Sequence, residues 1–254
     1  MRMMTDLKVE HINTVDSTNA ELKRRLLSGA VSGVCALRAD TQTAGRGRRG
    51  RVWLNTDGAL MMSVCLPLDG FSERETMLLS LTAAYAVKTA IAPYFDCAAI
   101  KWPNDVVVER GGEIKKLCGI LTEIVSAPCG TRYAVVGMGV NSNCDSVPEG
   151  LMQPATSIKA ESGKNVDIEA LAKNVFGLLI YYVNKLLSDT DSVFAEIKKH
   201  IITLGRPVRA VCSNGDEICG KAAEITLDGR LVLETKRGSI ILDAADVSIR
   251  TITD

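Results

Sequence analysis

The sequence is poor in aromatic residues and histidine, and it has no long apolar run. Aromatic residues make up 4% of the 254 residues, and His11 and His200 are the only histidines. None of the eight cysteines forms a Cys-x-x-Cys pair, so the usual zinc ligand sets are missing. No apolar run reaches the roughly 18 residues of a membrane-spanning helix, and residues 1–6 lack the apolar core of a signal peptide. We expect a cytoplasmic protein with free thiols and no protein-built metal site.

Charge imbalance and the common catalytic motifs are absent as well. Lysine plus arginine number 30 and aspartate plus glutamate number 30, a balance that argues against a general nucleic-acid coat. The chain contains no Gly-x-Ser-x-Gly, no phosphate-binding Gly-x-x-x-x-Gly-Lys-Ser/Thr and no cysteine with a plausible histidine partner. Any reaction is therefore expected to depend on positioning and charge neutralisation rather than on a protein nucleophile.

The most informative segment that is present is residues 41–53, TQTAGRGRRGRVW. Its three glycines alternate with four arginines, which combines close backbone approach with permanent positive charge. Such a loop fits a ligand with several anionic oxygens. The alternative is a flexible RGG-like tract that binds RNA. RGG tracts usually repeat in low-complexity surroundings, whereas this segment occurs once between two apolar segments, which favours an ordered anion-binding loop.

The hydrophobic pattern predicts an α+β fold with a mixed sheet, followed by a small β-barrel. Helices do not alternate strictly with strands, so a doubly wound sheet is not expected. The expected helices cover residues 20–27, 73–92, 168–187 and 192–201, and the expected strands of the main domain cover 34–37, 60–66, 98–101, 106–109, 117–125 and 133–140. Short strands at 208–212, 220–225, 231–234, 239–242 and 247–252 predict the barrel. We place a catalytic domain at 1–203 and the barrel at 204–254.

Four further segments carry possible chemistry, and each also has a purely structural interpretation. Residues 16–19 (DSTN) supply helix caps, and residues 101–105 (KWPND) form an ordinary turn if taken alone. The lysines at 115–116 are typical of a solvated strand end, and the glycines at 137 and 139 are explained by tight packing. In a functional interpretation the same residues hold a polar ring, a reacting anion and a closely approaching ligand.

Taken together, these segments resemble the biotin protein ligases, in order and in approximate spacing. The motifs that carry the resemblance are at residues 16–19, 41–53, 101–105, 116–123 (KLCGILTE), 137–141 (GMGVN) and 246–250 (DVSIR). The resemblance implies a catalytic domain similar to the class II aminoacyl-tRNA synthetases, with an SH3-like barrel behind it. It also implies a two-step ligase: biotin and ATP, with Mg²⁺, give biotinyl-5′-AMP, and a lysine of a biotin carboxyl carrier domain, typically of acetyl-CoA carboxylase, then takes the biotinyl group.

The resemblance assigns roles to the cations of the site. Arg48 is expected to hold the phosphate and carboxylate together, with Gly45, Arg46 and Gly47 beside it. Lys116 is expected to bind the oxygen at the reacting carbon. Bringing a carboxylate and a phosphate together costs several kcal/mol unless cations and N–H donors are fixed in place beforehand. One such donor is typically worth ~3 kcal/mol in a transition state.

The polar residues are expected to hold the two substrates. By resemblance, Ser17, Thr18 and Gln42 contact the ureido and ring parts of biotin, and Trp53 shields the biotin–adenylate junction. Asn19 and Gly119 complete the binding set.

The nucleotide side is expected to use three more residues, namely Asn104, Asp105 and Asn141, which serve ATP and its Mg²⁺. Mg²⁺ would be coordinated mainly by the ATP phosphates, which suits the lack of a set of carboxylate ligands in the sequence. Asp105 is also a candidate to steer or accept the proton of the acceptor lysine.

Three other hypotheses stay open at this point: a lipoate-protein ligase, a nucleic-acid-binding protein that uses the arginine loop and the barrel, and a biotin sensor without activity. Relatives that also repress transcription carry an N-terminal helix-turn-helix, for which there is no room before Val15, so DNA binding by that route is not expected. The family includes homodimers, and the residues do not decide whether this chain forms one.

Overall fold

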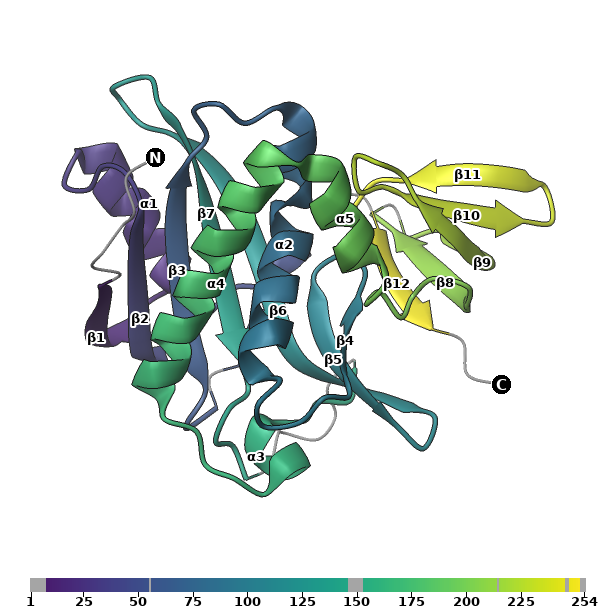
Figure 1. The fold of residues 1–254 in the computed structure, drawn as a ribbon, viewed down its shortest axis with the longest axis horizontal. Helices are drawn as coiled ribbons and strands as arrows, with labels where there is room; N and C mark the ends of the chain where they lie inside the picture. Colours follow the sequence, from purple (N-terminus) through teal and green to yellow (C-terminus); the bar gives the residue numbers. More distant parts are fainter. Residues whose placement is uncertain (1–7, 55, 146–152, 214, 245–246, 252–254) are drawn as a thin grey trace.

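A seven-stranded mixed sheet with helices on both faces makes up the larger part of the molecule (Figure 1). The computed structural model describes residues 8–54, 56–145, 153–213, 215–244 and 247–251. The sheet has the strand order β1-β2-β3-β7-β6-β5-β4, in which β1 and β2 are parallel and all other neighbours are antiparallel. Its strands are β1 (Val9–Val15), β2 (Cys35–Gln42), β3 (Leu60–Pro67), β4 (Ala98–Lys101), β5 (Asp105–Arg110), β6 (Glu113–Ser126) and β7 (Arg132–Val140). The α+β class is confirmed.

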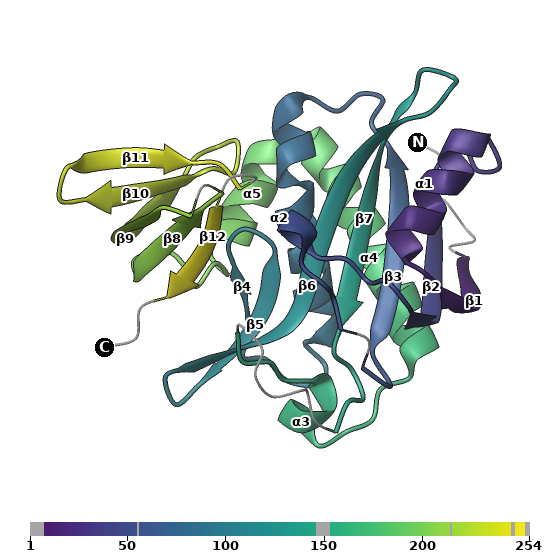
Figure 2. The same ribbon diagram turned by 180° about the vertical axis from the view of Figure 1, so that it is seen from behind.

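The helices divide between the two faces of this sheet. They are α1 (Thr18–Ser28), α2 (Glu73–Ile91), α3 (Ile158–Ser162), α4 (Ile168–Ser188) and α5 (Thr190–Lys198). α2 and α4 pack against each other and cover one face, and α1 lies on the opposite face, as the reverse view in Figure 2 shows. Residues of β3 alternate accordingly, with Met62 and Val64 in the large core under α2 and Cys65 in a smaller cluster under α1.

Local sequence explains where the main helices begin and end. The sequence Ser72-x-x-Glu75 predicts a capping box at the start of α2, and the structure has it. The helix is apolar on nearly all sides and is buried over most of its surface. Ser17 caps α1 by accepting a hydrogen bond from the Ala20 amide, and Gly29 ends that helix in the left-handed conformation at φ 74°.

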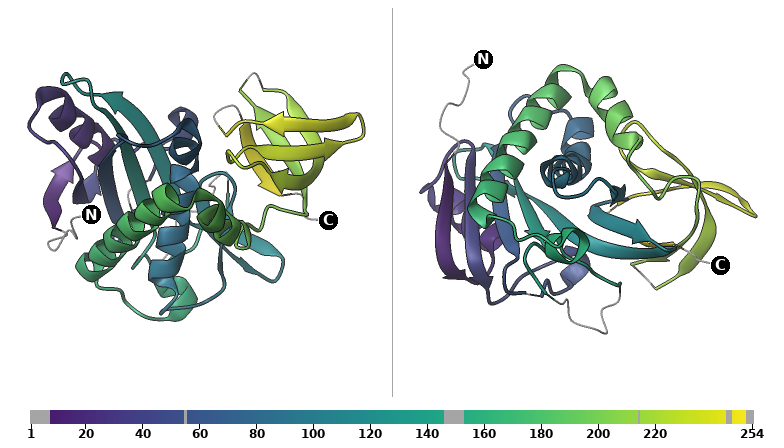
Figure 3. Two further views of the ribbon diagram at one scale, coloured as in Figure 1. Left: turned by 45° about the horizontal axis from the view of Figure 1, so that its top comes forward. Right: turned by 60° about the horizontal axis from the view of Figure 1, so that its bottom comes forward.

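A second, five-stranded antiparallel sheet follows, with the order β11-β10-β9-β8-β12 (Figure 3). Its strands are β8 (Pro207–Cys212), β9 (Glu217–Ile225), β10 (Leu231–Thr235), β11 (Gly238–Leu242) and β12 (Val247–Thr251). The strand spacing predicts a small β-barrel here, and the resemblance implies that it is the SH3-like unit. Arg206 joins it to the first sheet through a two-pronged ion pair with Glu109, with N–O distances of 2.6 and 2.7 Å.

Several elements differ from the sequence prediction. β1 and α3 were not predicted: β1 is exposed at most positions, and α3 has only five residues, so neither has a strong periodic signal. β6 begins at Glu113, so Lys116 lies within a strand rather than before one. The Asn-, Pro- and Gly-rich residues 141–153 predict a loop, of which 146–152 lie outside the described residues. Residues 1–6 and position 246 of the motif at 246–250 also lie outside them. Among the residues that the structure describes, no helix is long and apolar enough to cross a membrane.

Candidate active site

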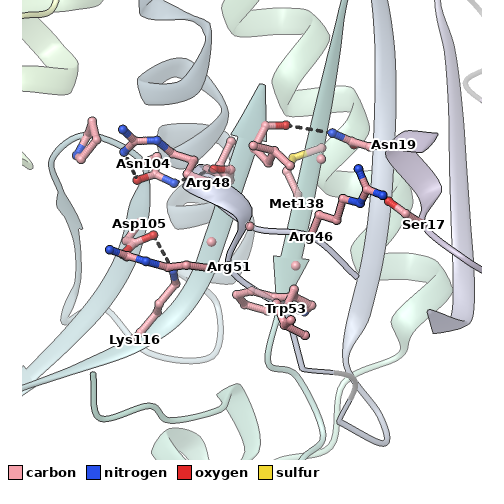
Figure 4. A pocket seen from close by; sticks show the side chains of 18 of the residues that line it. Ser17, Asn19, Arg46, Arg48, Arg51, Trp53, Asn104, Asp105, Lys116 and Met138 are labelled. Atoms are coloured by element: carbon pink, nitrogen blue, oxygen red, sulfur yellow. Dashed lines mark hydrogen bonds and ion pairs between the residues drawn. The ribbon is translucent and has the colours of Figure 1, made fainter. Parts of the chain in front are cut away.

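The arginine loop forms one wall of a pocket over the first sheet, on the face that carries α1 (Figure 4). The loop folds back on itself through the Gly47 amide, which donates to the Arg51 carbonyl at 2.7 Å, and the Trp53 amide, which donates to the Gly45 carbonyl at 3.0 Å. A short 3₁₀ turn (Arg48–Gly50) forms its tip, where Arg49 has φ 57°. Non-glycine residues seldom adopt this left-handed conformation, so neighbouring contacts must hold it in place.

Contacts with the second sheet hold that tip. The Arg49 guanidinium donates to the carbonyl oxygens of Val211 and Cys212 at 3.0 and 2.9 Å. Both acceptors lie in the last two residues of β8. The loop that lines the pocket is therefore attached at its tip to the SH3-like unit.

Glycines on two neighbouring strands form the floor of the pocket. Gly119 of β6 and Gly139 of β7 are cross-strand partners, and the Trp53 indole lies directly on them. A Cβ atom at Gly139 would lie 2.4 Å from Trp53 Cε2, and one at Gly119 would lie 2.8 Å from Trp53 Cζ3. Only glycine lets the indole approach the sheet this closely. The indole N–H is buried and has no hydrogen-bond partner in the described part of the chain, so a ligand oxygen could accept from it.

A hydrogen-bonded group of polar side chains forms the end of the pocket near α1. Gln42 Oε1 accepts from the Thr18 amide at 2.8 Å and lies 3.1 Å from Thr18 Oγ1. The Ser63 hydroxyl lies 2.7 Å from Thr18 Oγ1 and 2.6 Å from Asn19 Oδ1. Asn19 Nδ2 donates to Glu123 Oε2 at 2.8 Å, which fixes the orientation of its amide. These bonds hold the group in one arrangement before any ligand arrives.

Two cations meet the KWPND corner at the other end of the pocket. Lys116 Nζ lies 2.7 Å from Asp105 Oδ1 and 5.5 Å from the centre of the Trp53 ring. Arg48 Nη1 donates to Asn104 Oδ1 at 3.0 Å. Burial lowers the pKa of the Arg48 guanidinium and the nearby Asp105 carboxylate opposes that shift, but arginine stays protonated at neutral pH.

The charge of the whole lining is strongly positive. Five cationic side chains and one carboxylate, Asp105, line a cavity of about 150 Å³. The cations are Arg46, Arg48, Arg51, Lys101 and Lys116. Their excess in a chain of zero net charge suits a site where two anionic groups must meet.

Comparison with known proteins decides the family. Residues 12–141 match the biotin/lipoate A/B protein ligase family, and residues 203–250 match the biotin protein ligase C-terminal domain. The chain belongs to the biotin protein ligase family. It is 32% identical to the biotin--[acetyl-CoA-carboxylase] ligase of Mycobacterium tuberculosis, over 91% of this chain and 85% of the relative. It is also 32% identical to the enzyme of the same name from Paracoccus denitrificans, over 91% and 96% of the two chains.

A solved biotin protein ligase shares the arrangement of both sheets. The biotin protein ligase from Aquifex aeolicus in complex with biotin and ATP superposes with a TM-score of 0.82 at 28% identity. The match covers 96% of this chain and 99% of that structure. This likeness extends through the C-terminal unit of the biotin protein ligase fold, as well as the seven-stranded sheet.

Most residues that the sequence assigns to the site line the pocket. They are Ser17, Thr18, Asn19, Gln42, Arg46, Gly47, Arg48, Trp53, Asn104, Asp105, Lys116 and Gly119. Gly45 and Asn141 are not part of the lining. A Cβ atom at Gly45 would lie 2.7 Å from the Trp53 carbonyl oxygen, so this glycine lets the two arms of the loop approach. Asn141 Nδ2 donates to the Thr156 carbonyl at 3.0 Å, so its side chain ties two backbone segments together.

Several lining residues were not assigned from the sequence. Arg51 and Lys101 lie inside quoted motifs, and their charge could have identified them. Ile249 reaches the pocket from β12 of the second sheet. Ile249 lies in the quoted motif at 246–250, but its place in the pocket depends on how the two sheets pack, which no local pattern encodes.

Proposed function

We propose that this pocket joins biotin to the α-phosphate of ATP and then passes the biotinyl group to a lysine of a biotin carboxyl carrier domain, as in acetyl-CoA carboxylase. The names of the relatives and the family of both matched regions support this activity. The observation that carries it is the convergence of five cations on a glycine floor beneath Trp53, a site suited to two mutually repelling anions.

In the first step the biotin carboxylate attacks the α-phosphorus of ATP and pyrophosphate leaves. Arg48 is proposed to bridge the carboxylate and the phosphate, because its guanidinium presents several donors in one plane. Lys116 is proposed to bind an oxygen at the reacting carbon, as its Nζ lies between Asp105 and the Trp53 ring. Arg46 and Gly47 then contribute charge and a backbone donor from the same loop.

The two halves of the pocket suggest where each substrate lies. The Ser17, Thr18, Asn19 and Gln42 end offers neutral donors and acceptors of the kind that a ureido ring requires. The Asn104 and Asp105 end lies beside most of the cations and is proposed for ATP. Between the two ends, Gly119 lets Trp53 and Lys116 lie close against β6. Trp53 would cover the mixed anhydride of biotinyl-5′-AMP and exclude water from it.

Magnesium is proposed to enter with ATP as part of the substrate. The only carboxylate in the lining, Asp105, is already paired with Lys116, so the described residues do not offer a protein cage for the metal. Mg²⁺ commonly keeps water ligands and binds through substrate phosphates. Asn141, whose amide is tied to the Thr156 carbonyl, would act indirectly by supporting the strand end below the pocket.

In the second step the amine of the acceptor lysine attacks the anhydride carbon and AMP leaves. The attacking amine must first lose a proton, and Asp105 is proposed to steer or accept it. For this to happen Lys116 must release Asp105 or shift toward the substrate.

The remaining assignments are also proposals. The family matches and the two sheets support a boundary near residue 204, with a catalytic domain at 1–203 and a barrel at 204–254. A cytoplasmic location and a homodimer stay predictions, which fractionation and sedimentation would check. The expectation of no DNA binding would be checked by filter binding across a salt series, where weak binding is expected.

The direct test is a carrier domain incubated with this protein, biotin and MgATP. Intact-mass measurement should show one biotinyl group on one lysine. A parallel reaction with lipoate addresses the alternative that the shared family leaves open, and the match to the biotin ligase C-terminal domain favours biotin. Modification with lipoate but not biotin would overturn the proposal, and so would binding of biotin without pyrophosphate release.

A further inference from the structure

Two cysteines face each other on neighbouring strands beside the pocket. Cys35 is the first residue of β2, and Cys65 lies near the end of β3. They are direct cross-strand partners in the antiparallel β2–β3 pair, and their Sγ atoms lie 2.9 Å apart. Both are free thiols in this structure.

The backbone already has the spacing that a disulfide needs. Directly opposed residues in an antiparallel pair have Cα atoms about 4.5–5.5 Å apart. Disulfides form across Cα separations of about 4.4–6.8 Å. The spacing of the two strands at Cys35 and Cys65 is therefore compatible with a bond between them.

The surroundings give the two thiols different accessibility. Cys65 is fully buried beneath α1, in a cluster with Leu22 and Leu26. Cys35 packs against that cluster but is only partly buried. A small reagent can therefore reach Cys35 first, while Cys65 is held beside it.

We propose that Cys35 and Cys65 form a reversible disulfide site, closed by exchange with a small-molecule disulfide such as oxidised glutathione. The Cys35 thiolate attacks the reagent, forms a mixed disulfide and releases one glutathione thiolate, which takes up the proton that Cys35 lost. The Cys65 thiolate then attacks Cys35 Sγ, and the second glutathione leaves with the proton from Cys65. Two protein thiols are oxidised, and one glutathione disulfide is reduced to two thiols. In the reduced protein the hydrogen bond between the two thiols lowers the pKa of Cys65 and, together with burial, raises the pKa of Cys35, so the first attack is the slow step. The mixed disulfide removes this hydrogen bond, and the second attack depends on the closeness of the two Sγ atoms.

The site is close to the residues that hold the pocket end near α1. Ser63, two positions before Cys65 on the same face of β3, contacts Thr18 and Asn19. Gln42, at the far end of the strand that begins with Cys35, accepts from the Thr18 amide. The disulfide would lock the register of the two strands that support Thr18.

The test is to incubate the native protein in glutathione buffers of increasing oxidised fraction. Remaining thiols are alkylated under denaturing conditions, and the peptides are mapped by mass spectrometry. The expected product is a linked pair of peptides containing Cys35 and Cys65, which a monothiol reductant reverses. Cys65→Ser should stop at the mixed disulfide on Cys35, and Cys35→Ser should give neither product. Cys219→Ser, at an exposed cysteine of β9, is the matched control and should give the same linkage as the native protein.

Thermal unfolding shows whether the link forms in the folded protein. The bond joins residues 30 positions apart, so it should raise the midpoint of unfolding of the native protein by roughly 5 °C, and that of Cys65→Ser not at all. The exposed Cys129 indicates when glutathione disulfide has reacted with the protein. The proposal is overturned if Cys129 carries glutathione while Cys35 and Cys65 can both still be alkylated. It is also overturned if the linked peptides appear without a rise in the midpoint, because the bond would then form only in unfolded chains.

Discussion

At the residue scale, the position of the Trp53 ring depends on two glycines, which have no side chains to block it. Gly119 and Gly139 lie side by side beneath it, and any Cβ atom there would enter the ring. Gly137, one pleat further along β7, does the same for Asn19, whose Oδ1 would lie 2.4 Å from an added Cβ. The three glycines therefore form a continuous shelf under two side chains that line the pocket.

Gly139→Ala should displace the Trp53 indole and slow formation of the adenylate by about 10-fold or more, a barrier increase of roughly 1.4 kcal/mol. Pyrophosphate release measures the rate, and tryptophan fluorescence reports the move of the ring. The double variant Gly139→Ala/Trp53→Ala should form the adenylate almost as fast as Trp53→Ala alone, because without the indole the Cβ atom at position 139 has nothing to clash with. Additive losses in this cycle would show that the alanine acts on something other than the ring.

A second prediction at this scale concerns the bridge between the two anions. Arg48→Gly should slow adenylate formation by about 100-fold, since one fixed donor is worth about 3 kcal/mol in a transition state. It should also release the adenylate to solvent, which stopped assays of free and bound adenylate would detect. Arg48→Lys, which keeps the charge but lacks the planar fork, should recover part of the rate. Normal formation and retention in Arg48→Gly would contradict the proposed role.

At the element scale, the arginine loop behaves as a hairpin fixed at both ends and at its tip. The Arg46–Val52 bridge closes its base, and Arg49 attaches its tip to the last residues of β8. A loop of this composition would be flexible by itself, because glycine is conformationally permissive. The contact with β8 adds a restraint at the tip to the one that the bridge provides at the base.

Arg49→Gly should free the tip, because glycine accepts the left-handed backbone without cost but cannot reach β8. Trypsin should then cut after the neighbouring arginines several-fold faster, and bound adenylate should leave faster. The melting temperature should change by no more than about 1–2 °C, because surface changes have small effects on stability. Arg49→Lys, which keeps a cation at the same place, serves as the control for charge. Unchanged cleavage in Arg49→Gly would mean that the base of the hairpin is enough to hold the loop.

The sequence predicts most of these elements, and the exceptions have physical causes. The Ser-x-x-Glu pattern at Ser72 and the glycine after residue 28 are local signals, so the ends that they mark are predictable from the sequence. β1 was missed because it lies at the sheet edge with most of its side chains exposed, so it lacks an apolar alternation. The arginine loop could be recognised from its composition, but its attachment to β8 is a long-range contact that no local pattern encodes.

At the scale of the whole molecule, a few polar contacts connect the two sheets. Trp102, in the KWPND corner, donates its indole N–H to the Gly229 carbonyl at 2.8 Å. Arg206 pairs with Glu109 of β5, and Lys198 of α5 pairs with Glu224 of β9 at 3.1 Å. These contacts seat the second sheet against the strand ends that line the pocket.

The Glu109–Arg206 pair should stabilise the protein above, but not well below, the ordinary pKa of a glutamate. Its bond with Arg206 lowers the pKa of Glu109 from 4.5, so the stabilisation is present above pH 4.5 and is lost as pH falls through the lower, folded-state value. Because both side chains are about one third exposed, Glu109→Gln should cost only about 0.5–1 kcal/mol, or roughly 1–3 °C in melting temperature, at pH 7.

Melting curves of the native protein and Glu109→Gln across acidic pH measure this difference, which should narrow below pH 4.5. Glu224→Gln breaks the ion pair with Lys198, which is more exposed and has one contact, between the first domain and the second sheet. It should therefore change the melting temperature less than Glu109→Gln does. A difference that persists undiminished in acid would mean that Glu109 acts through packing rather than through its charge.

The reach of Ile249 into the pocket has a consequence for how the protein matures. Walls of the same cavity come from Ser17, near one end of the sequence, and from Ile249, near the other. The cavity is therefore complete only when β12 has paired within the second sheet, so the last wall of the pocket depends on the folding of a unit that is distant in the sequence from all the other walls.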